Sequence, residues 1–330
     1  MKKTLYILEN CEIKKEAKTI KVIMKDKSQV VPIETIKDIV VMGEAKMNKR
    51  LLGFLAQNSI MIHFFNFYEH YIGTFYPKNM LNSGKMVMKQ SLHYFKKEYR
   101  LYLAKEFVRG SIYNIQINLK YFQKNFKKDL RNELFLLKEI YNSVDNARFV
   151  NEAMGKEGNS RDLYYEGLKK VINGPTFFFE GRVKRSPQDP VNSMISFGNA
   201  ILYSTILSII YQTFLDPRIG YLHSTNDRSF SLNLDIADIF KPIIIDRLIV
   251  SLINKKQIKP EDFFRYKNSV RLRKKGRKKF LNEYEKKLSS VIKYTGTQKK
   301  SYKEIIKAEC YKLYKHFEEE EKYTSYNAHW

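Results

Sequence analysis

Short apolar runs alternate with turn-like breaks through residues 1–80. This pattern is typical of β-strands joined by turns. It predicts strands at residues 4–8, 19–24, 29–32, 38–42, 60–65 and 71–76. Residues 46–57 differ, because their leucines recur at helical spacing. We therefore expect a small β-rich domain that contains one short helix.

The pattern becomes helical beyond residues 77–85, which are rich in turn formers and lack an apolar face. One apolar stripe runs from residue 101 to residue 122. Further helices are expected at residues 130–146, 161–172, 191–215, 242–254, 276–294 and 301–321. The predicted fold class is α+β, with a β-strand-rich domain over residues 1–80, a linker over 81–88 and a larger all-α catalytic domain over 89–330.

Two apolar stretches resemble a membrane span and a signal peptide. Residues 191–215 carry no charge, but Asn192 and several serines interrupt them, which favours a buried core helix over a membrane span. The N-terminus begins like a signal peptide, yet Glu9 ends its short apolar run. Cys11 and Cys310 are too few for a disulfide framework. We expect a cytoplasmic protein without a membrane partner.

The large positive charge of the chain indicates a polyanionic partner. Lys and Arg total 60 against 35 Asp and Glu, which gives a formal net charge of +25. Such an excess is typical of nucleic-acid binding. An anionic membrane surface and a merely solvated basic surface are the alternatives.

Candidate chemistry is concentrated in residues 220–238, GYLHSTNDRSFSLNLDIAD. Asp235 and Asp238 are three residues apart, so a helix would place both carboxylates on one face, with His223 arriving from the preceding loop. Two carboxylates and one imidazole suit Mg²⁺ or Mn²⁺ better than structural zinc. The alternative is that the acidic residues cap a helix and that the histidine is structural.

Four segments of the chain form a recognisable series. They are MGKEGNSRDLYYEG, FFFEGRVKRSPQDPVNSMISFGNAILY, GYLHSTNDRSFSLNLDIADIFKPIIIDR and YTSYNAHW. Together they resemble the CRISPR-associated protein one family, the spacer-acquisition integrase and endonuclease of prokaryotic immunity. The likeness covers the whole chain, since VPIETIKDIVVMG also resembles that family's β domain. It is most similar to the type I-B branch.

The resemblance implies a β domain for dimerisation and partner contacts, a helical catalytic domain, a homodimer and a small second adaptation protein as partner. It implies that Glu157, His223 and Asp238 bind Mg²⁺ or Mn²⁺ and catalyse the reaction, with Asp235 in a supporting or shared role. Without the resemblance, Glu157 would be interpreted as a helix cap. Many relatives carry Glu in place of Asp238 and Arg in place of Lys241, which leaves the roles of Asp235 and Asp238 open.

The family reaction is a transesterification, in which a 3′-hydroxyl of new spacer DNA attacks a phosphodiester of the CRISPR repeat. The same site could deliver water and cleave DNA. A catalytically silent scaffold of the same fold is one alternative, and an RNA-binding module is another. The intact set of Glu157, His223 and Asp238 favours activity over both.

Basic segments near these motifs are candidate DNA contacts, because Lys and Arg position nucleic-acid phosphates. The GRVKRSP segment contributes Arg182, Lys184 and Arg185, and Asn192 follows it. The densest basic run contributes Arg271, Arg273, Lys274, Lys275 and Arg277. An exposed loop and a solvated helix surface are the alternatives for the two segments.

Overall fold

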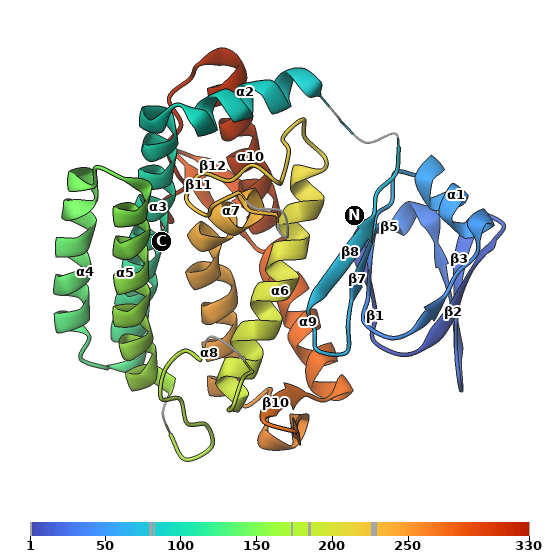
Figure 1. The fold of residues 1–330 in the computed structure, drawn as a ribbon. Helices are drawn as coiled ribbons and strands as arrows, with labels where there is room; N and C mark the ends of the chain where they lie inside the picture. The colour runs from blue at the N-terminus through green and yellow to red at the C-terminus, as the bar shows by residue number, and fades with distance from the viewer. Residues whose placement is uncertain are drawn as a thin grey trace. The chain divides into compact units, whose positions relative to one another are not determined.

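The computed structural model describes residues 2–78, 81, 83–172, 174–183, 186–225 and 230–329. The chain divides into two compact units, Met1–Asn82 and Ser83–Trp330. Strands make up most of the first unit and helices most of the second (Figure 1). The architecture is thus α+β, with N-terminal sheets followed by a helical region, as the sequence pattern predicts.

Two four-stranded sheets form the first unit, in the orders β1-β5-β7-β8 and β4-β3-β2-β6. The strands are β1 (Lys3–Ile7), β2 (Cys11–Glu16), β3 (Thr19–Met24), β4 (Ser28–Pro32), β5 (Ile36–Val41), β6 (Ala45–Lys46), β7 (Ile62–Phe65) and β8 (Tyr71–Phe75). Strand β2 was not among the predicted strands, because only Cys11 and Ile13 are buried in its charged sequence. Both sheets and helix α1 (Lys49–Gln57) contribute side chains to one hydrophobic core.

Nine α-helices are described in the second unit. They are α2 (Gly84–Phe95), α3 (Lys97–Phe126), α4 (Arg131–Ser143), α5 (Val150–Ile172), α6 (Pro190–Ile210), α7 (Leu232–Lys241), α8 (Arg247–Asn254), α9 (Lys274–Ser289) and α10 (Tyr302–Glu319). The long helix α3 confirms the predicted apolar stripe and packs against α2, α4, α5 and α7. Helix α7 continues into a π-helical segment, Pro242–Asp246, before α8 begins. The second unit is therefore organised around α3 and α7.

The prediction of an all-α second domain is wrong, because two β-hairpins interrupt it. Strands β9 (Phe263–Tyr266) and β10 (Ser269–Leu272) form one, and β11 (Val291–Thr295) and β12 (Gln298–Ser301) form the other. Residues 291–295, expected to end a helix, alternate between exposed and half-buried positions as β11. Gly296 has a φ of 54°, a conformation that glycine adopts without strain and that allows the chain to reverse there.

Residues 84–88, assigned above to a linker, form the first turns of α2. The helix begins there because the Ser83 hydroxyl accepts a hydrogen bond from the Met86 amide at 3.1 Å. Such a cap satisfies one of the amides that a helix start leaves unpaired. The short apolar face of this segment gave no helical signal in the sequence.

Helix α6 is a core helix of the second unit. Within the described residues it alone has the length and composition to cross a membrane, but most of it is buried. It packs against α7, α10 and β10. It ends at Ile210, earlier than predicted, because the backbone turns beyond Tyr211.

Candidate active site

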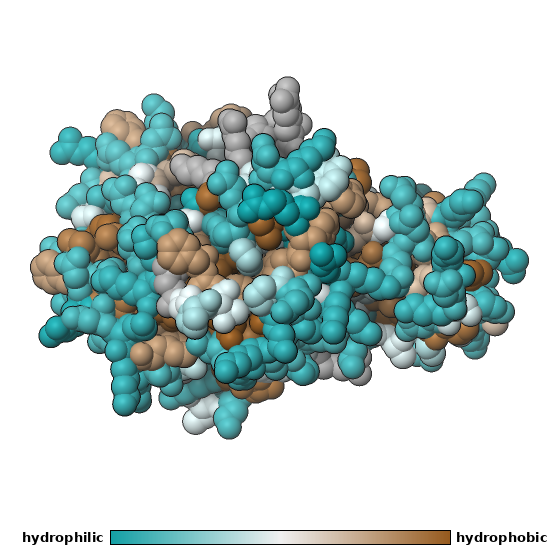
Figure 2. All heavy atoms as spheres, turned by 90° about the horizontal axis from the view of Figure 1, so that it is seen from below, coloured by the Kyte–Doolittle hydropathy of each residue, from teal (hydrophilic) through white to brown (hydrophobic). Residues whose placement is uncertain are grey.

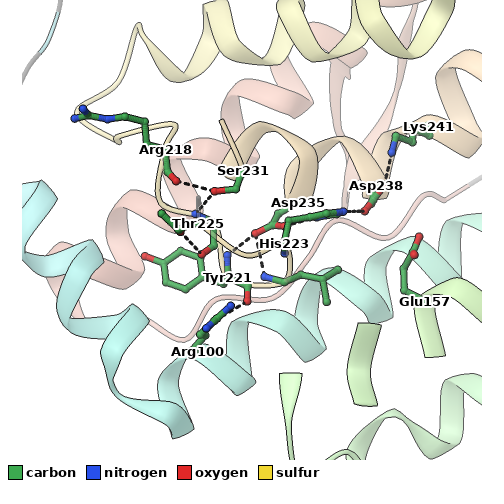
Figure 3. A network of polar contacts seen from close by, with 12 residues as sticks. Arg100, Glu157, Arg218, Tyr221, His223, Thr225, Ser231, Asp235, Asp238 and Lys241 are labelled. Carbon is green, nitrogen blue, oxygen red and sulfur yellow. Dashed lines mark hydrogen bonds and ion pairs between the residues drawn. The ribbon is translucent and has the colours of Figure 1, made fainter. Parts of the chain in front are cut away.

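Three elements bring the predicted site residues together. Helix α5 carries Glu157, the loop before α7 carries His223, and α7 carries Asp235 and Asp238 (Figure 3). The interpretation of Glu157 as a helix cap is wrong, since α5 begins at Val150 and Glu157 lies two turns inside it. The sequence concealed this start, because glycine and polar or charged residues occupy most of residues 150–160.

Asp235 of α7 binds the loop segment 221–223, which carries His223, through hydrogen bonds. It is fully buried, and its Oδ2 accepts hydrogen bonds from the amides of Tyr221 at 2.6 Å and Leu222 at 3.2 Å. Its Oδ1 accepts from the His223 amide at 2.9 Å and lies 2.8 Å from the imidazole Nδ1. Both carboxylate oxygens are thus engaged within the protein, so Asp235 positions His223.

His223 directs its other ring nitrogen toward Asp238. With Nδ1 held by Asp235, Nε2 lies 3.9 Å from Asp238 Oδ2, and the side chain is 34% exposed. Burial is the largest influence on the His223 pKa and lowers it, but the bond to Asp235 and the charges of Asp238 and Asp235 together raise it above its ordinary value. A bond from Nδ1–H to a carboxylate fixes the tautomer that leaves Nε2 free to bind a metal.

Asp238 is a buried carboxylate with two cationic neighbours. Lys241 Nζ lies 2.5 Å from its Oδ1, and Arg161 Nη2 lies 3.0 Å from the same oxygen. Burial raises the Asp238 pKa, but Lys241, Arg161 and His223 outweigh it and hold the pKa below its ordinary value. Asp238 is therefore ionised at neutral pH, with Oδ2 facing His223.

Glu157 joins this group through Arg161, one helical turn later on α5. Arg161 Nε donates to Glu157 Oε1 at 2.8 Å. Figure 3 shows Glu157 projecting from α5 toward Asp238. Sequence reasoning missed Arg161, because an i, i+4 pair is visible only once both residues are placed on one helix.

A second residue that sequence reasoning missed is Asp246, at the end of the π-helical segment. It is buried near Arg161, and burial raises its pKa to about 6. Because of this raised pKa, Asp246 adds only a partial negative charge to the cluster near pH 6. Its position in a π-helical segment is also typical of functional sites.

The donor set suits a divalent cation that prefers oxygen ligands. In octahedral coordination, ligand atoms about 2.1 Å from one Mg²⁺ lie roughly 3.0 Å apart when adjacent and roughly 4.2 Å apart when opposite. The 3.9 Å between His223 Nε2 and Asp238 Oδ2 lies between these separations, so the two side chains would have to shift to bind one ion. Among the described residues, no three His, Cys, Asp or Glu side chains are grouped closely enough to hold a metal as they stand. Glu157 would have to turn from Arg161 to complete the set.

Arg182 and Asn192, the described members of the first group of predicted DNA contacts, are engaged within the protein. Asn192 is fully buried. Its side-chain nitrogen donates to the Gly181 carbonyl and to Asp189, and its side-chain oxygen accepts from the Val183 amide and from Arg182. Its assignment as a DNA contact is therefore wrong for this conformation, because no polar atom faces solvent. Half-buried Arg182 donates to Asn192 at 2.8 Å and to Ser196 at 3.1 Å. Lys184 and Arg185 lie outside the described residues.

The second group divides between buried and exposed positions. Arg271 lies on β10 and is buried, so its assignment as a DNA contact is wrong for this conformation. Arg273, Lys274 and Lys275 are exposed at the start of α9. Half-buried Arg277 donates from Nε to the Leu272 carbonyl at 3.0 Å. The exposed part of this run remains a predicted phosphate-binding surface.

Comparison with known proteins identifies the family of the chain. The sequence model of a family described as CRISPR associated protein Cas1 matches residues 5–286. A protein of Thermodesulfovibrio yellowstonii named CRISPR-associated endonuclease Cas1 2 is 44% identical over 331 residues, which span 100% of both chains.

Solved structures extend the likeness to the fold. A Cas1 protein from Thermotoga maritima matches with a TM-score of 0.85 at 39% identity, over 96% of this chain and 97% of its own. A casposase bound to an integration product matches with a TM-score of 0.86 over 98% and 93% of the two chains, but at 19% identity it shows the fold alone. On the full-length identity and the family match, the chain belongs to the CRISPR-associated Cas1 family.

Proposed function

We propose that this protein is a divalent-metal-dependent DNA integrase that joins 3′-hydroxyl ends of spacer DNA to a CRISPR repeat and that also cleaves DNA. One observation carries the proposal: His223, fixed by Asp235, directs Nε2 at Asp238 Oδ2, and Glu157 connects to the same carboxylate through Arg161. Glu157, His223 and Asp238 would hold Mg²⁺ or Mn²⁺.

The chemistry requires positioning and neutralisation of charge. A bound divalent cation supplies electrophilic stabilisation of the phosphoryl oxygens and lowers the pKa of an attacking hydroxyl or water. Asp235 holds His223 in the metal-binding tautomer, which keeps the imidazole ready to bind. Lys241 Nζ forms an ion pair with Asp238 and lies 4.9 Å from the centroid of the Tyr203 ring, a cation–π contact. These two contacts hold the positive charge of Lys241 at the site. Phosphodiester exchange needs no energy cofactor, because one ester replaces another.

DNA is the proposed substrate, because the chain has a formal charge of +25 and hydrophilic residues dominate the face drawn in Figure 2. We also propose a homodimer with a Cas2-type partner. Support comes from a chain of similar fold, with a TM-score of 0.84 at 19% identity, in a solved Cas6-RT-Cas1–Cas2 complex. The type I-B assignment stays a prediction, which sequencing of the adjoining genes would test.

Strand transfer into a supercoiled plasmid that carries CRISPR repeats tests the function. A short labelled duplex with a 3′-hydroxyl is mixed with the protein, the small partner and either Mg²⁺, Mn²⁺ or EDTA. We expect label to enter the plasmid with either metal and not with EDTA or with a 3′-deoxy end. Equal joining in EDTA would contradict metal dependence. Light scattering of the protein alone, without partner or DNA, should give about twice the mass of the 39.3 kDa chain, and a strictly monomeric species would contradict the dimer.

A further inference from the structure

A buried arginine lies between the two carboxylates that we assign to the divalent cation. Arg161 Nε is 2.8 Å from Glu157 Oε1, and its Nη2 is 3.0 Å from Asp238 Oδ1. The Arg161 side chain is only 9% exposed, and that of Asp238 is 3% exposed. Two acidic groups from different helices are thus joined by one cation of the chain itself.

The charge of Arg161 is fixed. Burial is the largest influence on its pKa and lowers it, but Glu157 and Asp238 raise the pKa well above its ordinary value. A buried carboxylate without a counter-charge is unstable, so Asp238 depends on Arg161 and Lys241. A divalent cation at these carboxylates would supply the same compensation.

We propose that Arg161 is an internal counter-ion that competes with the divalent cation for Glu157 and Asp238. The inference rests on the proposed function, since it takes those two carboxylates as metal ligands. Binding of the cation requires the guanidinium to release Glu157, because Glu157 must turn toward His223 and Asp238 to complete the ligand set.

The released guanidinium stays at the site. Its Nη2 also donates to the backbone carbonyl of Asp238 at 3.2 Å, and that bond involves neither carboxylate. Arg161 therefore neutralises the carboxylates before the cation binds and keeps a backbone contact at the site afterwards.

Titration calorimetry with Mn²⁺ alone, without DNA, tests the competition. Arg161→Gln is expected to bind Mn²⁺ about tenfold more tightly than wild type, because the cation no longer displaces a charge-assisted hydrogen bond. Its melting temperature in EDTA should fall, and saturating Mn²⁺ should raise it by more than in wild type. Arg161→Lys keeps the charge but not the paired donors, so it should bind about threefold more tightly; this variant decides the matter if the glutamine variant does not fold.

Arg109→Gln is the matched control. Arg109 pairs with Glu106 on α3 and with Asp145 in the 3-10 turn Val144–Asn146 that follows α4, and its side chain is 23% exposed. Its loss should lower stability without changing Mn²⁺ affinity. Unchanged or weaker Mn²⁺ binding in the Arg161 variants would overturn the inference while leaving the proposed metal site intact. Absence of Mn²⁺ binding by wild type would overturn the metal site and the inference with it.

Discussion

Replacing His223 with Ala is expected to lower metal-dependent strand transfer by about a thousandfold or more, because a bound cation contributes several kcal/mol of charge stabilisation. The same loss is expected for Asp238→Ala, since Oδ2 of Asp238 faces the imidazole across 3.9 Å. Initial rates of plasmid joining at saturating Mn²⁺ measure the effect. His223→Ala should keep the helical circular dichroism of wild type, whereas Asp238→Ala leaves Arg161 and Lys241 without their shared counter-charge and should also lower the melting temperature.

The control for this pair is His329→Ala, which removes an exposed imidazole from the same unit. It should join DNA at the wild-type rate. Wild-type joining by a folded His223→Ala or Asp238→Ala protein would show that the chemistry lies elsewhere.

Replacing Asp235 with Asn is expected to reduce joining by roughly 10- to 100-fold, the range seen when a residue that orients a metal ligand is changed. The amide nitrogen of Asn cannot accept the hydrogen bonds that Asp235 receives from Tyr221, Leu222 and His223. The variant should lose about 2 kcal/mol of stability, since hydrogen bonds to a charged group are lost in a buried site. Because the ligands remain, higher Mn²⁺ should restore part of the rate.

Metal rescue separates the two roles that the sequence left open for Asp235. If Asp235 were itself a ligand, Asp235→Asn would lose joining as completely as His223→Ala, and added Mn²⁺ would not help. Glu309→Gln is the matched control, since Glu309 is also buried and accepts from the Tyr323 hydroxyl at 2.6 Å and the Tyr326 amide at 3.0 Å. The Glu309→Gln protein should be less stable than wild type, and its rate of joining should depend on Mn²⁺ concentration as in wild type.

The fold was predictable where one face of an element is apolar. The stripe of α3 and the alternation in β3 come from side chains that bury in a regular order, and β5 is a nearly continuous buried run. The pattern failed for β2, because charged residues dominate its sequence. It also failed for β9 and β10, because four residues each are too few to show a strand period. It also missed the start of α5, where small and polar residues pack.

The site was predictable only in part, for a related reason. Spacing placed Asp235 and Asp238 on one helix, and the family resemblance added Glu157. Which carboxylate orients the histidine depends on the path of the loop, and that path is set by backbone amides donating to Asp235. Arg161 was hidden until Glu157 and Arg161 were known to share a helix. Burial likewise removed Asn192 and Arg271 from the DNA-binding candidates.

The location of Mn²⁺ in crystals of the protein tests the central claim most directly. Anomalous scattering at the manganese edge identifies the ion without reference to its expected ligands. We predict a peak within bonding distance of His223 Nε2 and Asp238 Oδ2, with Glu157 as the third protein ligand and Asp235 still bonded to His223 Nδ1. A manganese peak bound elsewhere, or Asp235 as a direct ligand in place of Asp238, would contradict the account.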